Sequence, residues 1–321
     1  MILHTIFRRG FHFLNRQKNQ EGSFSTIINM DYVVNPFQSS SGLKNAKKVF
    51  EKIEEEKVIF HCYWFGPFGR MQAASITSLV TTQVSYKYEI WLWLDEATKA
   101  CNIDSKWIKE LPRTVIIKYY NPNIVKSVPD FRKVFYLFND MHHLPYRADG
   151  FRLWALHEFG GFYFDLDIMF FKDMGQLIRG PEFVYAWEKQ RYANNAIIYL
   201  RKNSWLNKYI ARKVRKTHST QPWIIFNYDD KNLKGLKLLS ASTFDPIWND
   251  DDPKYIIHNF SEFFIKPVSL DSFEEVFPFS YGYHWHNNWD VEINEMSLFA
   301  ILEKKNLEIL RNEGIIKDDC E

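Results

Sequence analysis

The sequence predicts an α/β protein whose central sheet is mostly parallel and flanked by helices. Three short apolar segments, at residues 58–65, 88–95 and 114–120, contain few polar residues, as expected of strands buried on both faces. A segment with helical character, residues 71–83, separates the first two strands, and this alternation is typical of βαβ units. With 321 residues, the chain is long enough for one large domain or two small ones.

Local signals define the elements that follow. Pro145 suits the first turn of a helix and Gly160-Gly161 suits its end, so we predict a helix from 145 to about 159. The segment after it, FYFDLDIMFF (162–171), is predicted to be one strand that carries two acidic residues. Further along, we predict strands at 183–187 and 196–200, and a helix from about 204 to 215.

Residues 1–57 are predicted to form an N-terminal extension. They begin with a basic stretch and continue with polar residues, and the extension ends in the charged segment LKNAKKVFEKIEEEK. Apolar residues in that segment recur at helical spacing, so we expect a helix that packs on the main domain. The main domain is predicted to span residues 58–321.

Composition excludes some classes of function. The chain has 41 Lys+Arg and 39 Asp+Glu, and a formal net charge of +2 argues against a nucleic-acid-binding protein. Aromatic residues make up 17% of the chain, a surplus that fits stacking on flat rings or on sugar faces, or a compositional bias. Three cysteines cannot form a disulfide framework, which favours a reducing compartment.

The N-terminus bears on localisation. No apolar run approaches the roughly 18 residues needed to span a bilayer. The first 14 residues, MILHTIFRRGFHFL, are basic and aromatic but lack an uninterrupted signal-peptide core and a cleavage site. We therefore expect a cytoplasmic protein, and peripheral membrane contact through residues 1–14 stays open.

The most informative segment for function is ADGFRLWALHEFGGFYFDLDIM, residues 148–169. Asp149 and Arg152 are three residues apart, so a helix places them on one face. Asp165 and Asp167 alternate around Leu166, so on an extended strand both carboxylates point to the same side, near the edge where open α/β sheets bind ligands. Two hard oxygen ligands suit Mg²⁺ or Mn²⁺.

An Asp-x-Asp pair alone is a weak signal, because such pairs are common on solvated strand edges. Here the apolar flanks FYF and IMFF make two neighbouring like charges costly unless a cation neutralises them. The Gly-Gly turn and the Asp149/Arg152 face add to the pattern. Together these features favour a metal site over a solvated edge.

The pattern resembles a known family. The run D-x-x-R-x-x-x-L-x-x-x-G-G-x-Y-x-D-x-D, from Asp149 to Asp167, is similar to the sugar-binding DXD region of glycosyltransferase family 32. That family includes initiating α-mannosyltransferases, α-galactosyltransferases and the catalytic domains of glucosylating toxins. Four flanking segments also resemble the family's motifs: IFHCYWFG (59–66), YEIWLWLD (88–95), ANNAIIYLRKNS (193–204) and YGYHWHNNW (281–289).

The resemblance implies a GT-A fold, which is a Rossmann-like α/β domain, and it implies roles for individual residues. Trp64 would stack on the base of a nucleotide-sugar, Asp149 would accept from donor hydroxyls, and Arg152 would reach the sugar or the diphosphate. Tyr163 and Trp289 would also bind the donor.

The resemblance also implies a metal centre with Mn²⁺ or Mg²⁺ as cofactor. Asp167 would ligate the ion directly, and Asp165 would act through the ribose or a water molecule. His284 and Asn288 are expected to contribute to the donor and metal shells. Arg152, Asp165 and Asp167 form the expected catalytic set. The chain departs from the family in having Asp245-Pro246 where a Gly-Pro is common.

The activity implied is that of a metal-dependent retaining glycosyltransferase. It would move a hexose from a UDP- or GDP-sugar to a hydroxyl of a glycan, lipid or protein acceptor. Two alternatives stay open: a nucleotidyltransferase or other phosphoryl-transfer enzyme, which also uses paired Asp, and a non-catalytic sugar-binding module. The chain has no Walker-type phosphate loop, which counts against the first alternative.

Overall fold

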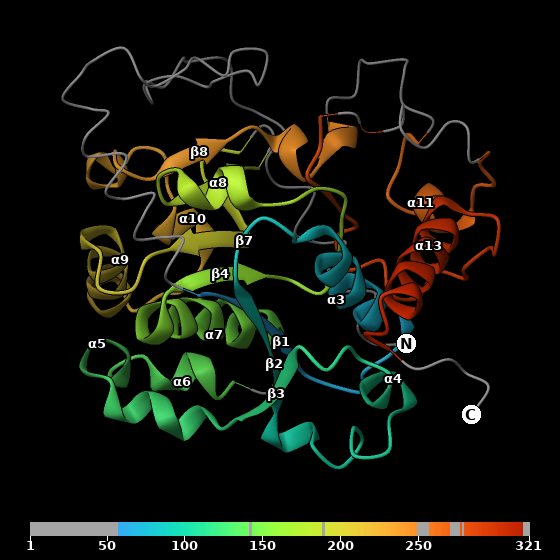
Figure 1. The fold of residues 1–321 in the computed structure, drawn as a ribbon. Coiled ribbons are helices and arrows are strands. Elements are labelled where there is room, and N and C mark those ends of the chain that lie inside the picture. Colours follow the sequence, from blue (N-terminus) through green and yellow to red (C-terminus); the bar gives the residue numbers. More distant parts are fainter. Residues whose placement is uncertain are drawn as a thin grey trace.

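A seven-stranded sheet forms the centre of the protein in the computed structural model, which describes residues 57–140, 143–187, 190–248, 257–269, 277 and 279–316 (Figure 1). The strand order is β3-β2-β1-β4-β7-β6-β8, and a second sheet pairs β5 with β9. The strands are β1 (Val58–Trp64), β2 (Tyr88–Asp95), β3 (Val115–Tyr120), β4 (Gly161–Phe164), β5 (Ile168–Phe170), β6 (Phe183–Ala186), β7 (Ala193–Leu200), β8 (Lys237–Leu239) and β9 (Gly282–His284).

The predicted fold class is confirmed. Strands β3, β2, β1 and β4 are parallel to one another, β7 runs antiparallel to β4 and to β6, and β8 is parallel to β6. The α-helices are α3 (Arg70–Thr82), α4 (Lys106–Lys109), α5 (Pro129–Arg132), α6 (Phe135–Phe138), α7 (Leu144–Phe159), α8 (Gly175–Arg179), α9 (Trp205–Thr217), α10 (Pro222–Ile225), α11 (Glu262–Ile265) and α13 (Leu298–Asn312). Short 3₁₀ segments, η1 (Glu96–Thr98), η2 (Pro122–Ser127), η3 (Lys231–Leu233), η4 (Ala241–Thr243) and η5 (Pro246–Trp248), connect them.

Helices cover both faces of the central sheet. On β4, Phe162 and Phe164 point into the core beneath α3, whereas Tyr163 points into the core beneath α7 and α9. The strand is therefore buried on both sides, which explains its apolar sequence. A third core lies between the small sheet, α11 and α13, and α13 runs beside α3 (Figure 1).

One predicted strand is wrong in its extent. Residues 162–171 do not form a single strand: β4 ends at Phe164, the chain bends through Asp165, Leu166 and Asp167, and β5 then pairs with β9 in the other sheet. Two adjacent carboxylates on one buried strand face would repel each other. The bend lets each carboxylate approach a cation of its own, as described below.

The start of β4 depends on glycine. Gly160 ends α7 with a φ of 68°, and Gly161 follows with a φ of 103°, a region that side chains with a Cβ rarely adopt. A Cβ on Gly161 would lie 2.3 Å from the carbonyl oxygen of Ile59 on β1. The close approach of β4 to β1 therefore requires glycine at this position.

We expect Gly161→Ala to lower the free energy of unfolding by about 3 kcal/mol or more, because both the backbone conformation and the contact with Ile59 are disturbed. Urea denaturation of purified protein measures this. Gly235→Ala is the matched control, since its Cβ would meet Leu206 at an ordinary 3.5 Å. Equal stability of the two variants would contradict the expectation.

Some predictions fall on residues outside the described ranges. These are the packing helix within residues 43–57, except for Lys57, and the membrane-contacting segment 1–14. The boundary between an extension and a main domain near residue 57 stays a prediction. Among the described residues, no helix combines the length and apolar character that crossing a membrane requires.

Candidate functional site

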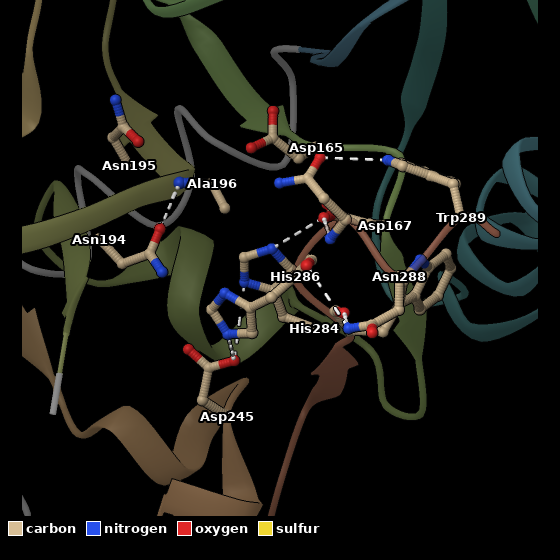
Figure 2. Close-up of polar contacts among 12 residues, drawn as sticks. Asp165, Asp167, Asn194, Asn195, Ala196, Asp245, His284, His286, Asn288 and Trp289 are labelled. Carbon is tan, nitrogen blue, oxygen red and sulfur yellow. Dashed lines mark hydrogen bonds and ion pairs between the residues drawn. The ribbon is translucent and has the colours of Figure 1, made fainter. Parts of the chain in front are cut away.

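The candidate site lies where several strands end at one edge of the central sheet. Asp165 follows β4, Trp64 ends β1, and Tyr185 lies near the end of β6. Because β7 is antiparallel to its neighbours, its first residues, Asn194 and Asn195, lie at this same edge. Figure 2 shows several of these side chains around Asp167 and His284, the last residue of β9.

Arg152 is the centre of a buried polar network on the α7 side. Its guanidinium donates to the carbonyl oxygen of Asn195 at 2.6 Å, pairs with Asp165 at 3.0 Å, and lies 3.6 Å from Asp149. It also lies over the ring of Tyr163, 4.9 Å from the ring centre. A planar guanidinium can reach these partners together, which a single ammonium cannot do.

Two further hydrogen bonds fix the acids of this network. The side-chain amide of Asn195 donates to Asp149 at 2.8 Å, and the hydroxyl of Tyr163 donates to Asp165 at 2.6 Å. Burial raises the pKa of Asp149, and the positive charge of Arg152 opposes that shift. Burial, assisted by the charge of Asp167, raises the pKa of Asp165 to about 6 against the opposing effect of Arg152.

Asp167 faces the opposite way, toward the small sheet. Its Oδ2 lies 3.2 Å from Nε2 of His284 and accepts a hydrogen bond from the backbone N–H of Asn287 at 2.9 Å. Burial alone would raise the pKa of Asp167, but the charge and hydrogen bond of His284 outweigh burial and lower it to about 2. Burial likewise disfavours the charged form of His284, but Asp167 raises its pKa to about 9.

The other oxygen of Asp167, Oδ1, is buried and has no hydrogen-bond partner. A buried carboxylate oxygen without a partner is costly, and a cation would satisfy it. Nε2 of His284 lies beside the other oxygen of Asp167, and Asp165 offers a further carboxylate on the α7 side. Carboxylate oxygens and an imidazole nitrogen are ligand types that Mn²⁺ accepts.

The two predicted tryptophans lie together. The rings of Trp64 and Trp289 meet edge to face with centroids 5.0 Å apart. The indole N–H of Trp64 donates to the carbonyl of Pro67, and that of Trp289 donates to the side chain of Asn287. The pair is partly exposed, so an aromatic ligand could contact it.

The predicted residues thus lie in three groups at one sheet edge: the network of Asp149, Arg152, Tyr163 and Asp165, the pair of Asp167 and His284, and the pair of Trp64 and Trp289. Asn288 is placed differently, since its side-chain amide donates to the carbonyl of Trp285 in its own loop. Its role as a metal ligand stays a prediction.

The sequence analysis did not assign roles to Asn194, Asn195, Tyr185, Asp245 and His286, although they lie in or beside the site. The two asparagines belong to a segment with family resemblance, and Asp245 marks a departure from the family's Gly-Pro. Asn194 accepts from the backbone N–H of Ala196, and its Nδ2 is buried without a partner. His286 lies in the resembling segment 281–289, whereas Tyr185 had no signal in the sequence and is placed here by β6.

A model of one protein family matches part of the chain. Residues 71–184 match the family model described as glycosyltransferase sugar-binding region containing DXD motif, which spans α3 to β6 and includes the acids after β4. No curated protein sequence matches the chain.

Several solved structures resemble the chain at low sequence identity. One is the PaToxG glycosyltransferase, which is 16% identical, with 60% of this chain and 72% of that chain covered and a TM-score of 0.39. Another is mouse xyloside xylosyltransferase 1, which is 12% identical, with 74% of this chain and 100% of that chain covered and a TM-score of 0.40. A third is the galactosyltransferase LgtC in complex with donor and acceptor sugar analogs. It is 10% identical, with 82% of this chain and 98% of that chain covered and a TM-score of 0.44. Because these scores are low, we rest the conclusions on the family match and on the site.

Proposed function

We propose that this chain, a glycosyltransferase whose residues 71–184 match the DXD-containing sugar-binding family, is a metal-dependent retaining hexosyltransferase that uses a UDP- or GDP-sugar. The acceptor would be a hydroxyl of a glycan, lipid or protein. The observation that carries the proposal is the buried, unpartnered Oδ1 of Asp167, whose other oxygen faces His284, two residues from Asp165 in its pair with the buried guanidinium of Arg152.

In this proposal Asp165, Asp167 and His284 hold Mn²⁺ or Mg²⁺. When bound, the ion would neutralise negative charge on the diphosphate leaving group. Arg152 is fixed by Asn195 and Asp165 before substrate arrives, so it can stabilise developing charge without reorganisation. Asp149, which Asn195 holds in place, is oriented to accept from donor hydroxyls.

The chemical step exchanges two bonds at the anomeric carbon. The bond to the phosphate oxygen breaks, the bond to the acceptor oxygen forms on the same face, and the acceptor proton passes to the leaving diphosphate. No dedicated base is needed for this route. Trp64 and Trp289 form the aromatic surface against which we place the nucleotide base.

A donor screen tests the proposal. Unfolding of the full chain is followed with UDP- and GDP-sugars, with and without Mn²⁺, and hydrolysis of each donor is measured. A donor at 100 times its Kd should stabilise the protein by about 2.7 kcal/mol, and should do so only with the metal. Stabilisation by no donor would overturn the proposal, and release of a sugar 1-phosphate in place of a nucleoside diphosphate would favour a nucleotidyltransferase.

Metal binding should release about one proton at pH 7. The pKa of His284 is about 9, so its imidazole is protonated at that pH and must lose a proton to ligate a metal. Because the metal competes with this proton, affinity for Mn²⁺ should increase as the pH rises toward 9. Calorimetric titration in two buffers of different ionisation enthalpy gives the proton count, and a count of zero would contradict His284 as a ligand.

A further inference from the structure

Asp245, His284 and His286 form a compact cluster next to the proposed donor site (Figure 2). One ligand atom from each lies within 4.8 Å of the others. Oδ1 of Asp245 is 2.7 Å from Nε2 of His286 and 3.6 Å from Nδ1 of His284. Two imidazole nitrogens therefore point at one carboxylate oxygen.

The fold imposes this arrangement. Asp245 follows η4, where its backbone N–H donates to the carbonyl of Ala241 at 2.7 Å. His286 has a φ of 49°, an uncommon conformation for a residue with a Cβ, and its ring contacts those of Trp248 and Phe260 with centroids 4.6 and 4.5 Å away. An uncommon backbone conformation held by packing is typical of functional sites.

The cluster contains a buried carboxylate oxygen without a partner. Asp245 is fully buried, and its Oδ2 has no hydrogen-bond partner. In the described part of the chain, the ion pairs of Asp245 are with the two histidines, one of which also faces Asp167. A buried carboxylate oxygen without a partner is stabilised by a bound cation.

We propose that Asp245, His284 and His286 form a second metal site, separate from the Asp165–Asp167 pair and selective for Zn²⁺. Two imidazoles and one carboxylate are a three-ligand set that zinc accepts with a fourth position left for water. Mg²⁺ prefers oxygen ligands and would bind poorly here. The hydroxyl of Tyr185, 2.8 Å from Nδ1 of His284, is the group that zinc would replace as that nitrogen's partner.

The two sites share one imidazole. His284 directs Nε2 at Asp167 and Nδ1 at Asp245. A neutral imidazole has a single lone pair on one nitrogen and a proton on the other, so it can ligate one metal at a time. Zinc on Nδ1 would therefore prevent Nε2 from ligating Mn²⁺. This competition, unlike the zinc site itself, rests on the proposed function.

The test is a titration of the metal-free full chain with Zn²⁺, followed by calorimetry, and with Co²⁺, followed by visible absorption. We expect the wild type and His218→Asn to bind one Zn²⁺ equally. His286→Gln and Asp245→Asn should bind it at least tenfold more weakly and lose the Co²⁺ spectrum. His218 is an exposed control with a positive φ that asparagine tolerates.

Two results would overturn the zinc site. One is unchanged zinc affinity in both His286→Gln and Asp245→Asn. The other is loss of zinc from Asp165→Asn alone, which would place the ion at the Asp165–Asp167 pair. Thermal melting monitors folding, and His286, being partly exposed, gives a variant that is less disruptive than one at the fully buried Asp245.

The competition is tested by electron paramagnetic resonance of bound Mn²⁺. Saturating Zn²⁺ should weaken Mn²⁺ binding at least tenfold in the wild type and leave it unchanged in His286→Gln. Unchanged Mn²⁺ affinity in zinc-saturated wild type would overturn the shared-ligand inference. Failure of Mn²⁺ to bind in any condition would overturn the proposed function instead, while the zinc titration would still decide the second site.

Discussion

Asp167→Asn should lower turnover of the nucleotide-sugar by ~10³-fold and remove most of the affinity for Mn²⁺. The substitution keeps the shape of the side chain but removes the negative charge that faces His284. It also leaves Oδ1, the buried oxygen without a partner, as part of a neutral amide that holds a cation weakly. Donor hydrolysis in saturating Mn²⁺ and a Mn²⁺ binding titration measure the two effects.

Asp104→Asn is the matched control, because that carboxylate is 93% exposed and pairs with Lys109 on the surface. It should leave both quantities unchanged. Full donor turnover by Asp167→Asn in saturating Mn²⁺ would contradict the metal site. A loss of activity accompanied by an equal loss of folded protein would point to a structural role, so thermal melting accompanies both measurements.

Much of the central sheet was predictable because its signals are local. The segments 58–65, 88–95 and 114–120 correspond to β1, β2 and β3, and Pro145 lies in the first turn of α7 as expected. Runs of apolar residues identify strands that are buried on both faces, and such runs do not depend on distant contacts. The order of strands beyond β4, with β7 antiparallel between β4 and β6, was not predictable from these signals.

The break between β4 and β5 shows where pattern reasoning fails. Alternation around Leu166 predicted two carboxylates on one side of a continuous strand. The actual geometry depends on Arg152, which belongs to α7, and on His284, which ends β9. Strand periodicity contains no information about cations contributed by distant segments. The presence of the two acids near this sheet edge was therefore predictable, whereas the geometry of their contacts was not.

Helix spacing was similarly incomplete for Asp149 and Arg152. The spacing of three residues correctly places them near each other, but their charged groups are 3.6 Å apart and each has a closer partner. Asn195 supplies both of those partners, through its amide to Asp149 and its carbonyl to Arg152. A residue at the start of β7 therefore organises the helix face, and this contact depends on the sheet topology.

Arg152→Lys should lower kcat/KM by ~10²-fold, although it conserves the charge. The guanidinium contacts Asn195 and Asp165 with separate nitrogens while it lies over Tyr163. A lysine ammonium has one nitrogen and cannot span both partners, so one of them would lose a buried hydrogen bond. We also expect a loss of about 1–3 kcal/mol in the free energy of unfolding.

Arg70→Lys separates the two effects. Arg70 makes a similar fork, to Glu303 and Glu295, but it joins α3 to α13 and the loop before it, and it contacts none of the residues that we propose to be catalytic. It should lower stability without changing kcat/KM per folded molecule. If Arg152→Lys changed kcat/KM no more than Arg70→Lys does, Arg152 would be a structural residue that only ties α7 to β7. Donor turnover and thermal melting are measured on the same samples of both variants. A fall in kcat/KM for Arg152→Lys alone would support the action of Arg152 on the diphosphate. The reason is that a positioned guanidinium fork stabilises the spread charge of a leaving group better than a point charge does.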